Sequence, residues 1–223
     1  MKVTKLGHCA LVLEIDGANP SDSSGRVRLL TDPGNWTIEV QSKLKGLDAI
    51  LITHEHQDHY HLESVKALLS NNPGVPIVAN ASMTALLAKD IPDAKVITVG
   101  DKQSTEVKGV SIEGFGKEHA EIYEQFGLVE NTGYFVGDKF YFPGDAFYNP
   151  GKKVDVLALP VAGPWMQLKH AIHCAKDISP RAAFGVHDGM ILPDFRGFVG
   201  MLFKHIVPNV EYVALQDGET REF

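Results

Sequence analysis

Short apolar runs bounded by turn-forming residues organise the first half of the chain. Alternating or continuously apolar runs predict half-buried or fully buried β-strands, and apolar residues at helical spacing, as at Leu62, Val65 and Leu68, predict helices. The predicted strands are Val3–Leu6, Ala10–Asp16, Arg26–Thr31, Asp48–Ile52, Ile77–Ala79, Lys95–Val99, Gln103–Val107 and Val110–Phe115. The predicted helices are Ile38–Leu44, Leu62–Ser70 and Ser82–Ala88.

The second half repeats this rhythm. Its predicted strands are Gly133–Val136, Lys139–Phe142, Val154–Leu159, Ala182–Val186 and Val210–Leu215, and its predicted helices are Trp165–Ile178 and Phe195–Ile206. The polar residues 17–25 predict a hairpin loop between two strands, because they are too few for a linker between domains. Strands in meanders with a few helices between them favour layers of β-sheet covered by helices, in a single domain over residues 1–223.

Composition narrows the class of protein. With 223 residues, 44% of them hydrophobic, the chain can bury one sizeable core. Its formal net charge of −7 argues against broad nucleic-acid binding, which usually needs a basic face. The two cysteines, Cys9 and Cys174, lie far apart in apolar settings, which favours reduced core thiols. No signal-peptide pattern and no long apolar run occur, so we expect a cytoplasmic protein without a membrane span.

One loop concentrates the chemistry. Residues 53–59, Thr-His-Glu-His-Gln-Asp-His, follow the predicted buried strand Asp48–Ile52 and carry the pattern H-x-H-x-D-H. Imidazole and carboxylate groups at this density can surround a transition metal. The helical zincin pattern H-E-x-x-H does not fit, because Asp58 stands where its second histidine would be. A solvated histidine-rich loop is the alternative interpretation.

Three further candidate ligands also follow predicted strands. His119 follows Val110–Phe115, Asp145 follows Lys139–Phe142, and His187 follows Ala182–Val186, each with a glycine nearby that lets the backbone approach a crowded site. Taken singly, a histidine at a strand end is more often a hydrogen-bonded surface residue. Their shared position, in a chain that already carries the loop, favours a common metal site.

The ordered set of histidines and aspartates resembles that of the metallo-β-lactamase-fold hydrolases. Within them, three segments look most like the ascorbate-6-phosphate lactonase-like metal-dependent hydrolases: Leu6-Gly7-His8-Cys9-Ala10, Thr31-Asp32-Pro33 and Tyr141-Phe142-Pro143-Gly144-Asp145. The resemblance spans nearly the whole chain. It implies a four-layer αβ/βα sandwich of two mixed β-sheets flanked by helices, with the site at one edge of the sheets.

The resemblance also implies two divalent metal ions. His54, His56 and His119 would hold the first ion, Asp58, His59 and His187 the second, and Asp145 would bridge them. These ligand types suit Zn, Mn or Fe, with zinc expected first. Two such ions about 3.5–4 Å apart can share a hydroxide that attacks a carbonyl or phosphoryl centre. Asp58 would bind metal, orient the nucleophile and act as general base.

Other residues are candidates for supporting roles. Asp32 could accept a hydrogen bond from a ligand histidine, or could simply form an Asp-Pro-Gly turn. His8 could line the site or cap a turn. The candidates for substrate binding, chosen from their positions near the ligands or on loops that lead from strands, are Trp36, Tyr60, Lys117, Tyr148 and Trp165, although an aromatic residue in such a place more often belongs to the core.

The leading hypothesis is a dinuclear metal-dependent hydrolase acting on a small-molecule ester, lactone or phosphorylated metabolite. A metal-dependent phosphodiesterase or nuclease is the first alternative, and the acidic charge balance counts against it. A non-hydrolytic redox or sensing module with bound metal is the second. The expected partner is a small molecule, not nucleic acid or membrane, and a homo-oligomer is compatible with the sequence.

Overall fold

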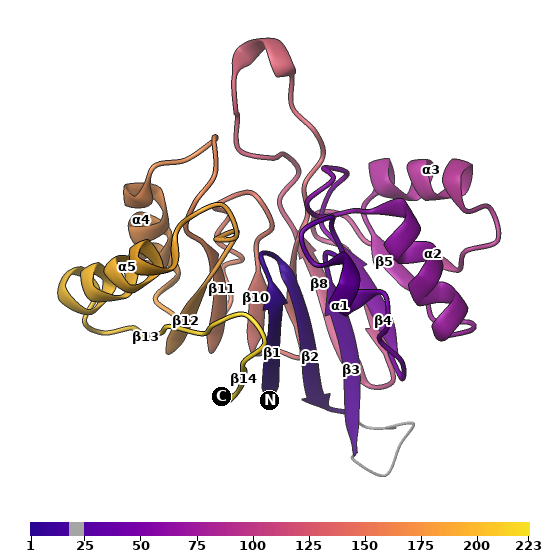
Figure 1. The fold of residues 1–223 in the computed structure, drawn as a ribbon, viewed down its shortest axis with the longest axis horizontal. Helices are drawn as coiled ribbons and strands as arrows, with labels where there is room; N and C mark the ends of the chain where they lie inside the picture. Colours follow the sequence, from indigo (N-terminus) through magenta and orange to yellow (C-terminus); the bar gives the residue numbers. More distant parts are fainter. Residues whose placement is uncertain (18–24) are drawn as a thin grey trace.

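The computed structural model describes residues 1–17 and 25–223, and the hairpin loop predicted over residues 17–25 lies outside the described residues except at its two ends. These residues build two β-sheets that face each other and carry helices on their outer sides (Figure 1). The predicted αβ/βα fold of two mixed sheets flanked by helices is confirmed. The two chain ends lie close together, and the amino group of Met1 donates to the carbonyl of Phe223.

The first sheet comes mainly from the N-terminal half and is completed by the last strand of the chain. In spatial order it contains β14 (Thr220–Glu222), β1 (Lys2–Gly7), β2 (Ala10–Asp16), β3 (Arg26–Thr31), β4 (Ala49–Ile52), β5 (Ile77–Ala79) and β6 (Val96–Thr98). The strands from β14 to β3 pair antiparallel, and those from β3 to β6 pair parallel. The parallel strands therefore end at one edge of this sheet.

The second sheet has the same mixed character. In spatial order it contains β13 (Glu211–Val213), β12 (Ala182–Val186), β11 (Val156–Pro160), β10 (Phe140–Phe142), β9 (Gly133–Val136), β8 (Val110–Phe115) and β7 (Ser104–Val107). The strands from β13 to β10 pair parallel, and those from β10 to β7 pair antiparallel. The predicted hairpin across Gly137-Asp138 joins β9 to β10.

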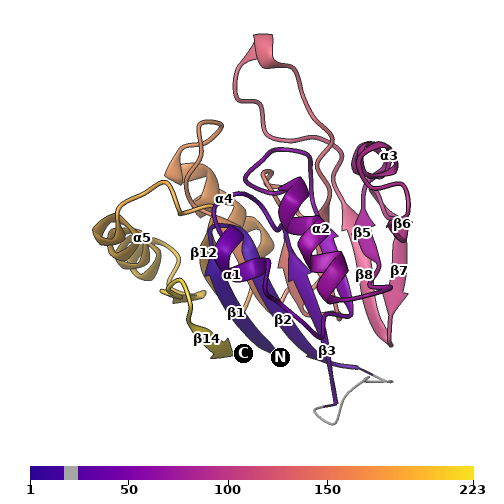
Figure 2. The ribbon, with the colours of Figure 1, turned by 45° about the vertical axis from the view of Figure 1, so that its right-hand side comes forward.

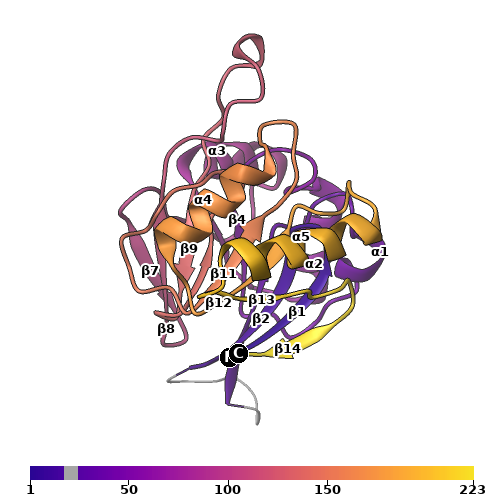
Figure 3. The same ribbon diagram turned by 90° about the vertical axis from the view of Figure 1, so that its left-hand side faces the viewer.

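Helices cover the outer face of each sheet. The helices α2 (Leu62–Asn71) and α3 (Ala81–Asp90) lie on the first sheet, with the short α1 (Ile38–Gln41) beside α2 (Figure 2). The helices α4 (Leu168–Ile178) and α5 (Pro193–Ile206) lie on the second sheet (Figure 3). A long loop between β8 and β9, which contains the 3-10 turn η1 (Glu124–Phe126), projects beyond the sheets (Figure 1).

Continuous apolar runs such as β4 have a simple cause. Ala49 and Leu51 face the other sheet, whereas Ile50 and Ile52 pack beneath the helices of the first sheet. Because successive strand residues point to opposite faces, a strand covered on both sides must be apolar at every position. The strand that leads to the histidine loop is thus held from both sides.

The predicted elements appear in the predicted order, with differences at their ends. The helix predicted to begin at Trp165 begins at Leu168, because Gln167 caps it together with His170, three residues on. The strand β14 and the turn η1 had no recognisable pattern, since β14 is short and exposed. Among the described residues no helix is long and apolar enough to cross a membrane.

Replacing Leu51 with alanine should lower the free energy of unfolding by about 2–5 kcal/mol, because Leu51 is fully buried between the sheets and its removal leaves a cavity. Chemical denaturation followed by circular dichroism measures this. Leu192→Ala is the control, since Leu192 is 76% exposed and should change stability by less than about 0.5 kcal/mol. Equal losses in both variants would contradict this account of the core.

Candidate metal centre

The ends of five strands bring the predicted ligands to one place. The loop 53–59 follows β4, and Asp32 follows β3, its parallel neighbour. From the second sheet, His119 follows β8, Asp145 follows β10, and His187 follows β12. The carboxyl ends of parallel strands lie at the same edge of a sheet, which is where open α/β sheets usually bind ligands. Because the two sheets face each other, strand ends from both sheets contribute candidate ligands to the same place.

The candidate ligands form two adjoining groups. In each group the ligand atoms all lie within 4.8 Å of one another; one group is His54, His56, His119 and Asp145, and the other is His8, Asp58, His59 and His187. Asp145 touches both groups, because its Oδ2 lies 3.2 Å from His119 Nε2 and 3.0 Å from His187 Nε2, and its Oδ1 lies 3.2 Å from His59 Nε2. The structure thus brings together all seven predicted ligands, and it adds His8.

Hydrogen bonds on the outer side of three histidines set their tautomers. His59 Nδ1 donates to Asp32 Oδ2 over 2.7 Å, and His119 Nδ1 donates to the backbone carbonyl of the next residue. The Thr53 hydroxyl donates to Asp32, so its lone pair accepts from His54 Nδ1, 3.0 Å away. A neutral imidazole carries one proton, so in all three rings the lone pair of Nε2 faces the centre.

Buried atoms without partners test whether metal ions fit this centre. Within the described part of the chain, His59 Nε2, His187 Nε2 and Asp145 Oδ1 are buried and have no hydrogen-bond partner. His59 Nε2 and Asp145 Oδ1 lie 3.2 Å apart and form an ion pair when His59 is protonated, but once His59 is neutral its remaining proton is on the other nitrogen and both facing atoms are left with lone pairs. Unsatisfied buried polar atoms are costly. Divalent cations would satisfy lone pairs of this kind, so the residues fit a metal centre.

The buried histidines and aspartate of the centre shift one another's pKa values. Burial by itself lowers the pKa of His59 and His187, but the carboxylate of Asp145 outweighs burial and raises the pKa of His59 well above its usual value and that of His187 to about 9. Burial would raise the pKa of Asp145, yet the neighbouring histidines hold it well below its usual range. Burial also lowers the pKa of His54 well below its usual value. The carboxylate of Asp145 is therefore ionised at neutral pH.

Asp32 both forms a turn and supports the loop. It is fully buried with a φ of 36°, and its carboxylate accepts hydrogen bonds from the backbone N–H of Thr53 (2.8 Å), the Thr53 hydroxyl (2.7 Å) and His59. Two residues later, Gly34 packs directly on the histidine loop, since a Cβ at Gly34 would lie 1.9 Å from the carbonyl oxygen of Asp58. The Asp-Pro-Gly turn therefore fixes the loop through a side chain and through a close backbone approach.

Three of the predicted substrate-binding residues border the centre. The Trp165 ring lies 5.6 Å from the rings of both His119 and His187 and is nearly buried. Trp36 is half exposed and stacks on the His8 ring at 5.0 Å. Tyr148 lines a cavity beside His119. Aromatic side chains thus surround the candidate ligands on several sides.

Two other predicted substrate-binding residues lie elsewhere. Tyr60 is buried in the core beneath α2 and α3, and its hydroxyl faces Asp90, 3.4 Å away. Its neighbour His59 faces the centre, and the chain turns the next side chain to the opposite side. Lys117 is exposed and lines a different depression together with Glu118 and Glu130. Both residues are close to a candidate ligand in sequence, but Tyr60 lies in the core and Lys117 lines a different depression.

Several residues that hold the candidate ligands in place were not predicted from the sequence. Thr53 is one, although its position directly before the first histidine of the loop could have suggested it. Asn131 is another, and its amide oxygen accepts from the backbone N–H of Asp145 over 3.0 Å. Buried Lys5 donates to Asp188, next to His187, over 2.6 Å. Asn131 and Lys5 lie far from the ligands in sequence, and no local pattern marks them.

Replacing Asp32 with asparagine should weaken metal binding about 10–100-fold, because the amide loses the charge that holds His59 and Thr53. Competition with a chromophoric chelator measures the affinity. Asp138→Asn, in the exposed turn between β9 and β10, is the matched control and should bind metal like the unchanged protein. Unaltered affinity in the Asp32 variant would refute the supporting role.

Metal binding at neutral pH should release about two protons per chain, one each from His59 and His187, whose raised pKa values keep them protonated when no metal is bound. Metal affinity should accordingly fall as the pH is lowered. Isothermal titration calorimetry in buffers of different ionisation enthalpy counts the protons. Binding without proton release would show that these histidines are neutral in the metal-free protein.

Comparison with known proteins agrees with this fold and centre. The family described as "Beta-lactamase superfamily domain" matches residues 2–187. Protein Rv0786c of Mycobacterium tuberculosis is 34% identical over 202 residues, which cover 88% of each chain. A protein of Aeropyrum pernix named UPF0173 metal-dependent hydrolase is 26% identical over 249 residues, covering 100% of this chain and 97% of its own.

Solved structures share the fold at lower identity. The structure of Igni18, described as a novel metallo hydrolase from the archaeon Ignicoccus hospitalis, superposes with a TM-score of 0.76 at 20% identity and covers 100% of this chain and 98% of its own. The two sheets with their outer helices are thus the metallo-β-lactamase fold, and homologues of this chain are named metal-dependent hydrolases. Because the family match spans residues 2–187, the chain belongs to the β-lactamase superfamily.

Proposed function

We propose that this protein is a dinuclear metal-dependent hydrolase of small-molecule esters or lactones. The observation that carries the proposal is the pair of ligand groups joined by Asp145, whose two carboxylate oxygens contact different histidines. One group alone would support a mononuclear or structural site. Two groups that share a buried carboxylate are what a two-ion hydrolytic centre requires.

The residues divide into roles. His54, His56 and His119 would hold one ion, and Asp58, His59 and His187 the other, with Asp145 between them. Bound ions, zinc first and manganese or iron next, would lower the pKa of water to supply a shared hydroxide and would polarise the scissile carbonyl. Asp58 is suited to orient the nucleophile and accept its proton, because its side chain is 24% exposed whereas that of Asp145 is buried.

The cavity beside the centre favours an uncharged substrate with an aromatic or apolar part. It has a volume of about 390 Å³ and opens beside His119; the residues around it are Glu118, His119, Ala120, Ala146, Phe147, Tyr148 and Asn149. This lining contains no lysine or arginine, and Lys117 belongs to another depression. A phosphate remote from the reacting bond usually needs such a cation. A carboxylic ester or lactone therefore fits better than a phosphorylated metabolite.

The likeness of three segments to the ascorbate-6-phosphate lactonase-like hydrolases supports a lactone as the reacting group. The same cavity gives no support to a phosphate on that lactone. Nucleic acid as substrate has the same difficulty, because an extended phosphate backbone needs several cations along its path. We further propose that the protein acts in the cytoplasm on a small molecule, without a nucleic-acid or membrane partner.

Asp58→Asn should reduce kcat for a phenyl ester or an aryl-substituted lactone at least about 100-fold, because the amide cannot accept the proton of the nucleophile. Protein loaded with zinc or manganese is assayed against esters, lactones, phosphate monoesters and phosphodiesters. Asp93→Asn, in the exposed loop between α3 and β6, is the control with unchanged kcat. Preferential cleavage of phosphodiesters would favour the nuclease alternative, and fewer than two bound metal ions would exclude the dinuclear centre.

A further inference from the structure

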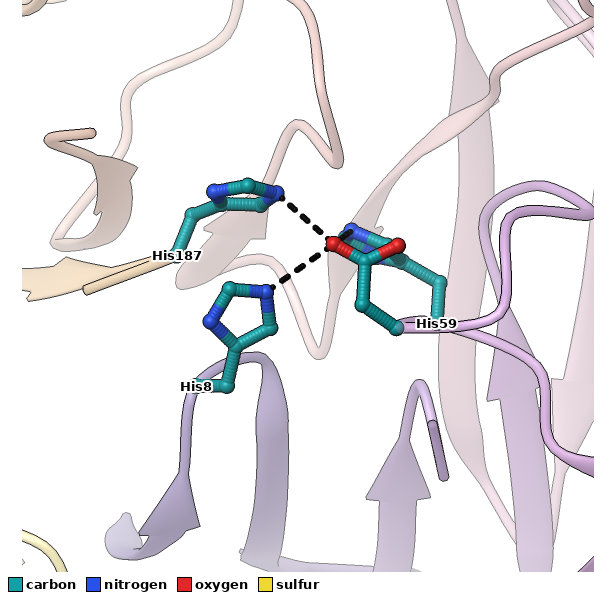
Figure 4. Close-up of side chains that lie close together, drawn as sticks. His8, His59 and His187 are labelled. Atoms are coloured by element: carbon teal, nitrogen blue, oxygen red, sulfur yellow. Dashed lines mark hydrogen bonds and ion pairs between the residues drawn. The ribbon is translucent and has the colours of Figure 1, made fainter. Parts of the chain in front are cut away.

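His8 is buried beside the second ligand group. It lies in the tight connection between β1 and β2, is 2% exposed, and has a φ of 47°. Its Nε2 lies 3.2 Å from Asp58 Oδ2. In Figure 4, His8 and His187 point toward the same carboxylate, with His59 beside it. Such an imidazole is either a further metal ligand or a hydrogen-bond donor.

The backbone of Gly189 distinguishes these two roles. Its N–H donates to His8 Nδ1 over 3.2 Å, so Nδ1 carries the lone pair. A neutral imidazole has a single proton, which must then sit on Nε2, the nitrogen that faces Asp58. A protonated nitrogen has no lone pair for a metal ion. The arrangement is the reverse of that in His54 and His59, whose Nδ1 atoms donate outward.

We propose that His8 is a positioning residue, which donates from Nε2–H to Asp58 Oδ2 and does not bind metal. The Asp side chain has a broad torsional preference about its last bond, so a carboxylate that must both bind metal and orient a nucleophile needs a fixed donor. His8 supplies a side-chain hydrogen bond to Asp58, whereas His187 Nε2, also 3.2 Å from Asp58 Oδ2, belongs to the candidate ligands. The inference rests on the proposed function, because it gives Asp58 that double role.

The surroundings of His8 are built to hold its ring. Trp36 stacks on it with 15° between the ring planes, and a Cβ at Gly189 would lie 3.0 Å from His8 Nδ1 and 2.9 Å from the Trp36 ring. The His8 carbonyl also accepts from the backbone N–H of His187 over 3.2 Å. The loop after β12 thus donates two hydrogen bonds to His8, one to its backbone carbonyl and one to its ring, and glycine at position 189 leaves room for this contact.

Two substitutions of His8 separate the roles of its two nitrogens. His8→Asn places an amide near Nδ1, so it can still accept from Gly189, and asparagine tolerates the left-handed backbone, but it cannot reach Asp58. His8→Gln extends an N–H donor toward the place of Nε2. We expect His8→Asn to lower kcat about 10–100-fold with little change in KM, and His8→Gln to recover most of that loss.

The metal content of the same variants is the second readout. Both should keep the two ions of the unchanged protein, measured by elemental analysis after loading with zinc. Loss of one ion in both variants would overturn the proposal and make His8 a ligand. Full activity in His8→Asn would also overturn it. Gly189→Ala should resemble His8→Asn, whereas Gly197→Ala is a matched control, because a Cβ at Gly197 meets no atom within 4 Å.

Long-range ¹H–¹⁵N NMR of the zinc-loaded protein reports the tautomer directly. We expect His8 to show a protonated Nε2 and an unprotonated Nδ1 that bears no metal, while His59 shows the opposite pattern. A protonated Nδ1 with a metal-bound Nε2 on His8 would refute the proposal. This result does not depend on finding a substrate, so failure of the hydrolase proposal in the esterase assay remains distinguishable from failure of this one.

Discussion

Every part of this centre depends on the burial of the Asp145 carboxylate among imidazoles. Asp145 is 1% exposed, and its oxygens lie within 3.8 Å of histidines from β4, β8 and β12 segments. Taking a charge out of water is costly unless it is paired and hydrogen-bonded. Without metal, protons on the histidines compensate this charge, and with metal the ions would do so. The protonation of the histidines around the buried carboxylate should therefore depend on whether metal ions are bound.

The packing of the two sheets stabilises this arrangement, because it fixes the relative positions of the strands that carry the candidate ligands. Residues such as Leu51, Ala158 and Phe184 fill the space between the sheets, and helices cover both outer faces. Strands anchored on both sides have little freedom to move apart. Ligands at their ends keep their relative positions even though like-charged groups, such as Asp58 and Asp145, face one another there.

Hydrogen bonds to the outer nitrogens of the histidines set the tautomers of these rings in two opposite ways. Asp32 and Thr53 accept hydrogen bonds from the outer nitrogens of His59 and His54, which turns lone pairs toward the centre. Gly189 donates to the outer nitrogen of His8, which turns a proton toward the centre. The difference between an acceptor and a donor behind a ring decides whether an imidazole can bind metal. Three aromatic residues lie around the candidate ligands: Trp36 stacks on His8, Trp165 lies against His119, and Tyr148 lines the cavity beside His119.

The sequence by itself determined the elements and the candidate ligands. Strand and helix periodicity is local, and the pattern H-x-H-x-D-H together with His119, Asp145 and His187 after strands pointed to the same edge of the fold. Tertiary structure decided which neighbours face inward. Tyr60 follows His59 directly yet belongs to the core, whereas Asn131 and Lys5 support the centre from distant segments.

The function of His8 is the clearest case of this division. The sequence marked His8 as either lining the site or capping a turn, and the structure places its ring beside the second group of candidate ligands. Its tautomer is set by a backbone N–H 181 residues further along the chain, at Gly189. No pattern within one segment can specify a hydrogen bond between segments so far apart. Local spacing in the sequence therefore identifies candidate ligands, but which ring nitrogen of a histidine carries the proton depends on tertiary packing.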